Sequence, residues 1–171
     1  MEMLGVIIGG LLTLAAVYVG HLLEKGRVER KEIAQRVSDR AHLAGALLAE
    51  LRSLRERYME VAGAQIERAQ TYRDFAGYTS PGFNYFSVFD GNTSRLGMLE
   101  IGDAELVVNT YVRAKGHLDG LRMWGEIVLP TRNLQVMESF FNQVKRDHNT
   151  LKGLFDKVQP TLQAYIDRHT S

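Results

Sequence analysis

An uncharged apolar run near the N-terminus constrains this chain more than any other feature. Residues 3–23 read MLGVIIGGLLTLAAVYVGHLL, which is 21 residues without Asp, Glu, Lys or Arg. As an α-helix this run would measure roughly 31 Å, about the thickness of the bilayer hydrocarbon. Tyr18 and His21 lie toward its C-terminal end, where amphipathic rings are tolerated near the membrane interface. We therefore expect residues 1–23 to form a transmembrane anchor.

A cleaved signal peptide is the main alternative for this run. Such a peptide has a basic start, a shorter apolar stretch and a cleavage site of small residues. No Lys or Arg precedes the run and no A-x-A tract follows it, which favours an uncleaved anchor. Basic residues follow the run at once: Lys25, Arg27, Arg30 and Lys31. The positive-inside rule then places the N-terminus outside and residues 24–171 in the cytoplasm.

Small residues recur along one face of the apolar run. Their steps are 4, 4, 3 and 4, so on a helix they form a single stripe: Gly5, Gly9, Thr13, Ala16 and Gly20. Such stripes let helices approach closely in lipid, which favours a homo-oligomer. A plainer interpretation is also open, because Gly and Ala are common in membrane helices in general.

Three later segments place apolar residues at alternating steps of 3 and 4, the spacing of helices that pack along a narrow seam. The first contains Ala44, Leu47, Leu51, Leu54, Tyr58 and Val61, with Ile33 and Val37 upstream. The second contains Val107, Tyr111, Ala114, Leu118 and Leu121. The third contains Leu134, Met137, Phe141, Val144, His148, Leu151, Phe155, Val158, Leu162 and Tyr165. We predict an all-α fold, with an N-terminal transmembrane helix followed by an elongated three-helix, coiled-coil-like bundle.

Helix breakers and turn residues set the expected boundaries. We expect helices over about 24–76, 103–128 and 131–168, with an aromatic loop at 77–102. Pro130 fits the first turn of the third helix, where its missing N–H costs nothing, and the tight joint makes the last two helices antiparallel neighbours. Pro160 should kink the third helix or end it near Val158, and of the two we expect a kink. Gly26 offers a bend in the first helix, although a helix can also pass straight through one glycine.

His148 occupies a seam position that would otherwise be apolar. We interpret it as a buried histidine that makes a hydrogen bond. A register-fixing polar position or a pH-sensitive contact is the alternative.

Aromatic residues are concentrated between positions 72 and 89: Tyr72, Phe75, Tyr78, Phe83, Tyr85, Phe86 and Phe89. One interpretation is a plug that closes the end of the bundle. The other is a docking surface, because aromatic clusters mark partner sites. The candidate docking residues are Phe83, Tyr85, Phe86, Phe89, Asp90, Asn92 and Arg95. Just after the cluster, Asp90 or Asn92 is placed to cap a short helical turn.

The run YFSVFDGNTSRLGML lies between the segments LRSLRERY and VVNTYV. This arrangement resembles uncharacterised small bacterial single-pass membrane proteins, often associated with mobile elements or prophages. The shared pattern is an aromatic residue before an acidic one, then Asn, a basic residue and Leu-Gly, here Phe89, Asp90, Asn92, Arg95, Leu96 and Gly97; Met98 stands where a second aliphatic residue is usual. The resemblance covers about residues 45–115 and implies an inner-membrane location and this topology. It brings no catalytic residues.

Composition excludes several function classes. The chain has no cysteine, which excludes disulfides, thiolate zinc sites and a cysteine nucleophile. A net charge of +1 argues against a nucleic-acid partner, and no glycine-rich phosphate loop or nucleophile elbow occurs. We therefore expect no enzyme activity, cofactor or metal, but a membrane-tethered scaffold that contacts the lipid bilayer, its own copies and a protein partner. The alternative is a membrane-perturbing or pore-forming effector, such as a toxin or phage-defence component.

Overall fold

The computed structural model describes residues 2–75 and 86–170, and the side chains of 2–17, 19 and 22 lie outside the described part. Within it the chain is all-α, as predicted, and no strand occurs. The long helices are α1 (Glu2–Tyr58), α4 (Ile101–Met123) and α6 (Leu134–Thr170). The short helices are α2 (Ala64–Arg68), α3 (Ser87–Asn92) and α5 (Leu129–Thr131). Two π-helical turns, η1 (Met59–Gly63) and η4 (Trp124–Val128), and two 3-10 turns, η2 (Tyr72–Asp74) and η3 (Thr93–Met98), complete the order.

Contacts divide the chain into two units, residues 1–39 and 40–171. In the first unit α1 does not end at Gly26. The side chains of Leu23, Val28 and Ile33 are exposed, and that of Val37 is half-buried. The upstream extension of the first seam is therefore wrong at Ile33, which is 62% exposed. Within the part of the chain whose side chains are described, no helical stretch is long and apolar enough to cross a membrane.

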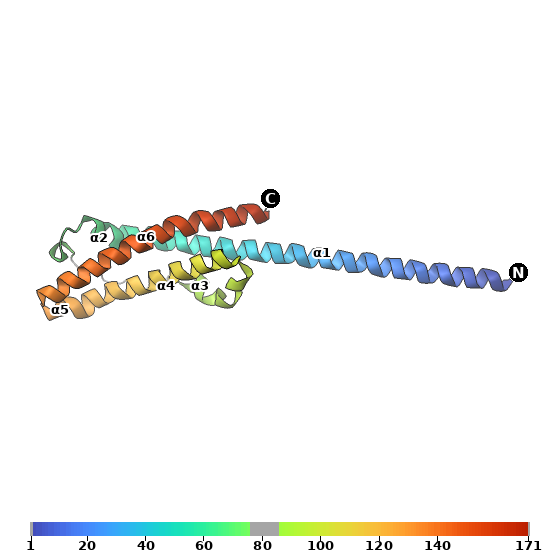
Figure 1. Ribbon diagram of the computed structural model, residues 1–171, viewed down its shortest axis with the longest axis horizontal. Helices are drawn as coiled ribbons and strands as arrows, with labels where there is room; N and C mark the ends of the chain where they lie inside the picture. The colour runs from blue at the N-terminus through green and yellow to red at the C-terminus, as the bar shows by residue number, and fades with distance from the viewer. Residues whose placement is uncertain (1, 76–85, 171) are drawn as a thin grey trace. The chain divides into compact units, whose positions relative to one another are not determined.

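The second unit is a helical bundle built around α4, α6 and the last part of α1. Figure 1 shows α4 and α6 side by side as an antiparallel hairpin closed at α5, with the last part of α1, from residue 40 onward, running along them. The third seam is confirmed from Phe141 onward, since all eight of its later positions are buried: Phe141, Val144, His148, Leu151, Phe155, Val158, Leu162 and Tyr165. Leu134, the first position of that seam, is 58% exposed.

The π-helical turn η1 changes which residues of the first seam face the core. The seam is confirmed from Ala44 to Tyr58, all of whose positions are buried, but Val61 is 37% exposed and Ala62 is buried instead. A π turn inserts one residue into the helical repeat, so the buried face moves forward by one position. The helix also ends earlier than expected, at Arg68, because Ala69 adopts an extended conformation.

The joint between the last two long helices lies later than expected. Pro130 is in α5, at the end of the second helical run, and not in the first turn of the third helix. Arg132 takes a left-handed conformation with φ 52, and this residue reverses the chain. The side-chain Oδ1 of Asn133 then accepts hydrogen bonds from the backbone N–H groups of Gln135 and Val136 and caps α6.

Pro160 does not end α6, which continues to Thr170. A proline inside a helix loses one backbone hydrogen bond and crowds the carbonyl four residues earlier. Leu162 and Tyr165 lie beyond it and are almost fully buried. Their burial offsets that cost and keeps the last turns helical.

Two exposed glycines inside long helices give a direct test of helix propensity. A Cβ placed on Gly116 in α4 or on Gly153 in α6 meets nothing within 4 Å. Alanine is favoured over glycine in helix interiors by about 0.8–1 kcal/mol, so Gly116→Ala and Gly153→Ala should each raise the free energy of unfolding by up to that amount. Urea denaturation followed by circular dichroism measures the change.

Gly63→Ala is the contrasting substitution, because a side chain at this position would be crowded. A Cβ on Gly63 lies 2.7 Å from the Sδ atom of Met59 and 3.4 Å from Cε1 of His148. Gly63→Ala should therefore gain less than Gly153→Ala, because Met59 has to move. An equal gain at both positions would show that the packing around Gly63 is looser than this geometry.

Candidate functional site

The aromatic region predicted as a loop contains the helix α3, and a carboxylate from α1 holds its N-terminus. Glu50 accepts hydrogen bonds from the backbone N–H groups of Val88, at 2.6 Å, and Phe89, at 3.0 Å. The hydroxyl of Tyr111 on α4 also donates to Glu50, at 2.8 Å. Glu50 thus caps α3 from a distant part of the sequence. The turn that Asp90 or Asn92 was predicted to cap is η3: Asp90 lies inside α3, and Asn92, at the N-cap position of η3, makes no capping hydrogen bond with its side chain.

Two of the candidate docking residues pack onto the bundle. Phe89 is 8% exposed and stacks on Tyr111, with ring centroids 4.1 Å apart. Phe86 is half-buried and meets the same tyrosine edge-on at 6.1 Å. Burial of these rings favours the plug interpretation for this pair and removes Phe89 from the accessible surface.

Charged neighbours cover the outer side of these rings. The ammonium group of Lys115 on α4 lies 5.0 Å from the Phe86 ring centroid and 2.5 Å from the Asp90 carboxylate. Asn92 donates to the backbone carbonyl of Val88, and Arg95 donates to the side chain of Asn92. Asp90 and Arg95 are exposed, and both are engaged by groups of this chain.

Several candidate residues lie outside the described residues. Phe83 and Tyr85 belong to the interval 76–85. In the small-residue stripe, the same holds for the side chains of Thr13 and Ala16, and Gly5 and Gly9 lie in that same N-terminal part. Gly20 is described: it is exposed, and a Cβ placed there meets nothing within 4 Å. The self-association of this stripe stays a prediction.

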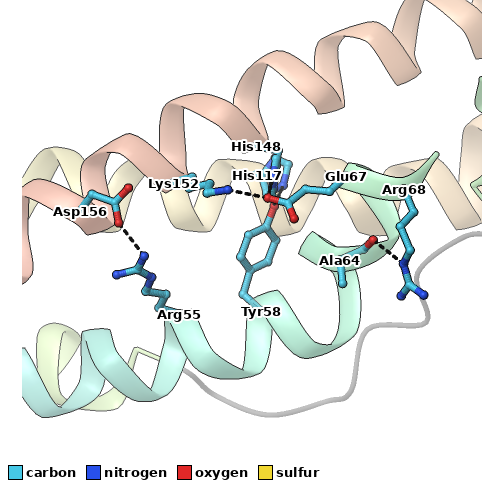
Figure 2. A network of polar contacts seen from close by, with 9 residues as sticks. All are labelled: Arg55, Tyr58, Ala64, Glu67, Arg68, His117, His148, Lys152 and Asp156. Atoms are coloured by element: carbon cyan, nitrogen blue, oxygen red, sulfur yellow. Dashed lines mark hydrogen bonds and ion pairs between the residues drawn. The ribbon is translucent and has the colours of Figure 1, made fainter. Parts of the chain in front are cut away.

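A buried polar cluster links the three long helices at one level of the bundle. The hydroxyl of Tyr58, the last residue of α1, lies 2.9 Å from Nε2 of His117 on α4 and 2.5 Å from Nδ1 of His148 on α6. All three side chains are at most 5% exposed. Figure 2 shows the tyrosine rising from α1 toward the two imidazoles. The expectation of a buried, hydrogen-bonded His148 is confirmed.

An ion pair on the bundle surface adjoins this cluster. Glu67 on α2 accepts a hydrogen bond from Nζ of Lys152 on α6 at 2.7 Å, as Figure 2 shows. The same carboxylate oxygen lies 3.4 Å from Nε2 of His148. That nitrogen is buried and makes no hydrogen bond with the described residues, so Glu67 is its charged neighbour at ion-pair distance.

Burial keeps both imidazoles neutral near pH 7. Burial, together with a smaller repulsion from a charged His148 and against the opposing effect of Asp147, lowers the pKa of His117 to about 4. Burial also lowers the pKa of His148, against the opposing effect of Glu67. The hydrogen bond from Lys152 holds the pKa of Glu67 below its usual value.

His117 was missed by the sequence patterns. The second seam was assigned to Leu118 because that residue is apolar, but Leu118 is only half-buried and His117 is 4% exposed. The sequence did contain a usable signal: His117 follows Ala114 by a step of 3, which the seam allows, so it could have been assigned to the seam as His148 was. Only the structure shows that one hydroxyl serves both rings.

The outer face of α4 carries an apolar groove of about 550 Å³ next to η3. Its most exposed side chains are Ile101, at 81%, and Val112, at 59%, with Val108 between them. Leu99 and Ala104 complete its apolar floor. None of the described residues fills this groove.

The arrangement is a helical bundle with a polar cluster in its core. Among the described residues, no three His, Asp or Glu side chains are grouped so that they would hold a metal ion. Comparison of the chain with protein-family models, with curated proteins and with solved structures gave no match.

Proposed function

We propose that this protein is a membrane-tethered helical scaffold that associates with its own copies and recruits a protein partner at the bacterial inner membrane. The observation that carries the proposal is where the bundle core begins. Among the side chains that the structure describes, the first buried apolar one is Ala41, whereas Leu23, Val28 and Ile33 before it are exposed. The described apolar side chains of residues 18–33 are thus exposed, which supports a segment that serves another environment.

The sequence supports the membrane as that environment. The run 3–23 is long enough to span the hydrocarbon and lacks charged residues, and a basic segment follows it directly. This topology keeps the bundle on the cytoplasmic side. The proposal places no catalytic step on the protein.

The surface of α4 supports association between copies. Ile101, Val108 and Val112 are spaced by 7 and 4, so they form one exposed stripe on a single helix. A two-fold axis would bring the same stripe of two copies together and cover the apolar groove. The occupant we propose is therefore a second copy of this chain.

Membrane attachment is tested by fractionation. The full-length protein should sediment with membranes, resist extraction by salt and carbonate, and dissolve in detergent. A cytoplasmic reporter fused after Ser171 should be active and an alkaline phosphatase fusion inactive. Recovery in the soluble fraction without detergent, or a mature N-terminus beyond Leu23, would refute the tether.

Self-association is tested with a bacterial membrane two-hybrid assay. Gly9→Ile should lower the signal because it widens the proposed packing stripe, whereas Gly10→Ile, about 100° around the helix, serves as the matched control. Val112→Asp should also lower the signal, with Ile127→Asp as the control for an exposed apolar residue elsewhere on the same helical run. Signals unaffected by both changes would leave a different protein as the occupant of the groove.

The effector alternative predicts a different phenotype. Induced expression would then admit a membrane-impermeant dye, and Gly5 or Gly9 substitutions would abolish the uptake. If the protein is a scaffold, induced expression should cause no dye uptake.

A further inference from the structure

The hydrogen bonds of the buried polar cluster depend on how many of its ring nitrogens carry a proton. Tyr58 has one hydroxyl proton, and two ring nitrogens, Nε2 of His117 and Nδ1 of His148, lie within hydrogen-bond distance of its oxygen. Each neutral imidazole carries one N–H and one lone pair. In the neutral cluster the hydroxyl donates to one histidine and accepts from the other, and its proton has an acceptor in these rings only when at least one facing nitrogen is unprotonated.

Glu67 sets the direction of the hydrogen bonds between Tyr58 and the two histidines. Its carboxylate lies 3.4 Å from Nε2 of His148, so the N–H of neutral His148 is best placed on that nitrogen. Nδ1 of His148 then accepts the proton of the Tyr58 hydroxyl, and Nε2–H of His117 donates to the Tyr58 oxygen. In this arrangement both imidazoles are neutral and both contacts to Tyr58 are hydrogen bonds.

Protonation removes that compatibility. When both imidazoles are charged, both facing nitrogens carry hydrogen, and the Tyr58 hydroxyl can donate to neither of them. Two positive rings would also lie within the same small volume. The hydroxyl proton then has no acceptor in either ring and the two charged rings repel each other, so the contacts that join α1 to α4 and α6 become weaker.

The charges around the cluster are mixed and come from every helix packed against it. His117 faces His148 and the carboxylate of Asp147 on α6. His148 faces Glu67 on α2 and the ammonium groups of Lys145 and Lys152 on its own helix. From α1 the facing group is Tyr58 itself. The two lysines oppose protonation of His148 and the carboxylates favour it, while burial opposes it at both rings.

We propose that the Tyr58, His117 and His148 cluster is a pH-sensitive latch, whose protonation in mild acid releases residues 59–75 from α6 before the bundle unfolds. This segment begins directly after Tyr58 and packs on His148 through Gly63. Two lysines of α6 hold it in place, Lys152 through Glu67 and Lys145 through the backbone carbonyl of Ala69. In this opening the contact of Tyr58 with His117 also breaks, so both histidines become exposed while α4 and α6 stay paired.

The sign of the effect follows from the neutral state of the rings. The native pKa of His117 is about 4 and its value when released is near 6.5. The closed state is thus fully favoured above pH 6.5 and loses stability as the pH falls toward 4. For His117 alone, the opening constant should rise about 20-fold between pH 7 and pH 5.

Hydrogen exchange of the full-length protein in detergent micelles, followed by mass spectrometry, tests this proposal. After correction for intrinsic exchange rates, peptides covering 59–75 should exchange up to about 20-fold faster at pH 5 than at pH 7. Peptides from the middle of α6 should change much less. An unchanged corrected rate in 59–75, or an equal change along the whole bundle, would overturn the latch.

Variants separate the histidines from other acid effects. His117→Gln combined with His148→Gln should abolish most of the pH response, while His42→Gln, an exposed histidine on α1, should keep it. Tyr58→Phe removes both bonds, so 59–75 should exchange quickly already at pH 7. A full pH response in the double histidine variant would refute the assignment, and the wild-type measurement decides the matter even if that variant fails to fold.

Discussion

Trp124→Ala is expected to lower the free energy of unfolding by about 3–5 kcal/mol, the usual range for removing a large buried aromatic residue. Trp124 is fully buried. The centroid of its ring lies 5.6 Å from the ring centroid of Phe75, 6.0 Å from that of Phe140 and 6.2 Å from that of Phe141. It therefore joins η4 to α6 and to the segment that follows α2. Small domains are stable by only about 5–15 kcal/mol, so this loss should shift the urea midpoint strongly.

Two further variants make this prediction specific. Trp124→Phe should cost clearly less than alanine, because it keeps an aromatic ring and removes an indole N–H that has no hydrogen-bond partner among the described residues. Met123→Ala, at a neighbouring side chain that is 43% exposed, should change stability by less than 1 kcal/mol. Equal losses for all three would contradict the packing role of Trp124.

Glu50→Ala is expected to cost about 3 kcal/mol. The substitution leaves the N–H groups of Val88 and Phe89 and the hydroxyl of Tyr111 without their shared acceptor. Hydrogen bonds to a charged group contribute about 1.5–3 kcal/mol each, and water replaces part of the loss at the more exposed donors. Urea denaturation monitored by far-ultraviolet circular dichroism measures the change.

Glu56→Ala is the matched control, because Glu56 is an exposed glutamate on the same helix. Its loss should alter stability by no more than about 0.5 kcal/mol. Glu50→Gln should fall between the two, since an amide oxygen still accepts but without the negative charge. A loss below 1 kcal/mol for Glu50→Ala would mean that α3 is not held by this carboxylate.

The regular part of the bundle could be predicted from the sequence because its periodicity is simple. From Phe141 to Tyr165 the alternation of 3 and 4 continues through α6, and every predicted position is buried. The same rule failed at Val61, where η1 inserts an extra residue, and at Leu118, where a histidine takes the core position. A π turn leaves no period of its own in the sequence, so the phase shift was invisible beforehand.

The polar contacts could not be predicted for a different reason. Glu50 reads as one of several charged residues on a helix, and its role depends on Val88 and Phe89, nearly forty residues away. Tyr58 was correctly placed in the seam, but nothing in the spacing pairs its hydroxyl with His117 and His148 together. Such pairings depend on the rotation and height of three helices, which heptad patterns do not specify.

The position of the indole gives this protein a built-in optical reporter. Trp124 is the one tryptophan in the chain, and it touches Phe75, at the far end of the segment that begins after Tyr58. Water reaching the ring would shift its emission to longer wavelength. Fluorescence of the unlabelled protein therefore follows solvent entry beneath that segment in real time, separately from any loss of helix.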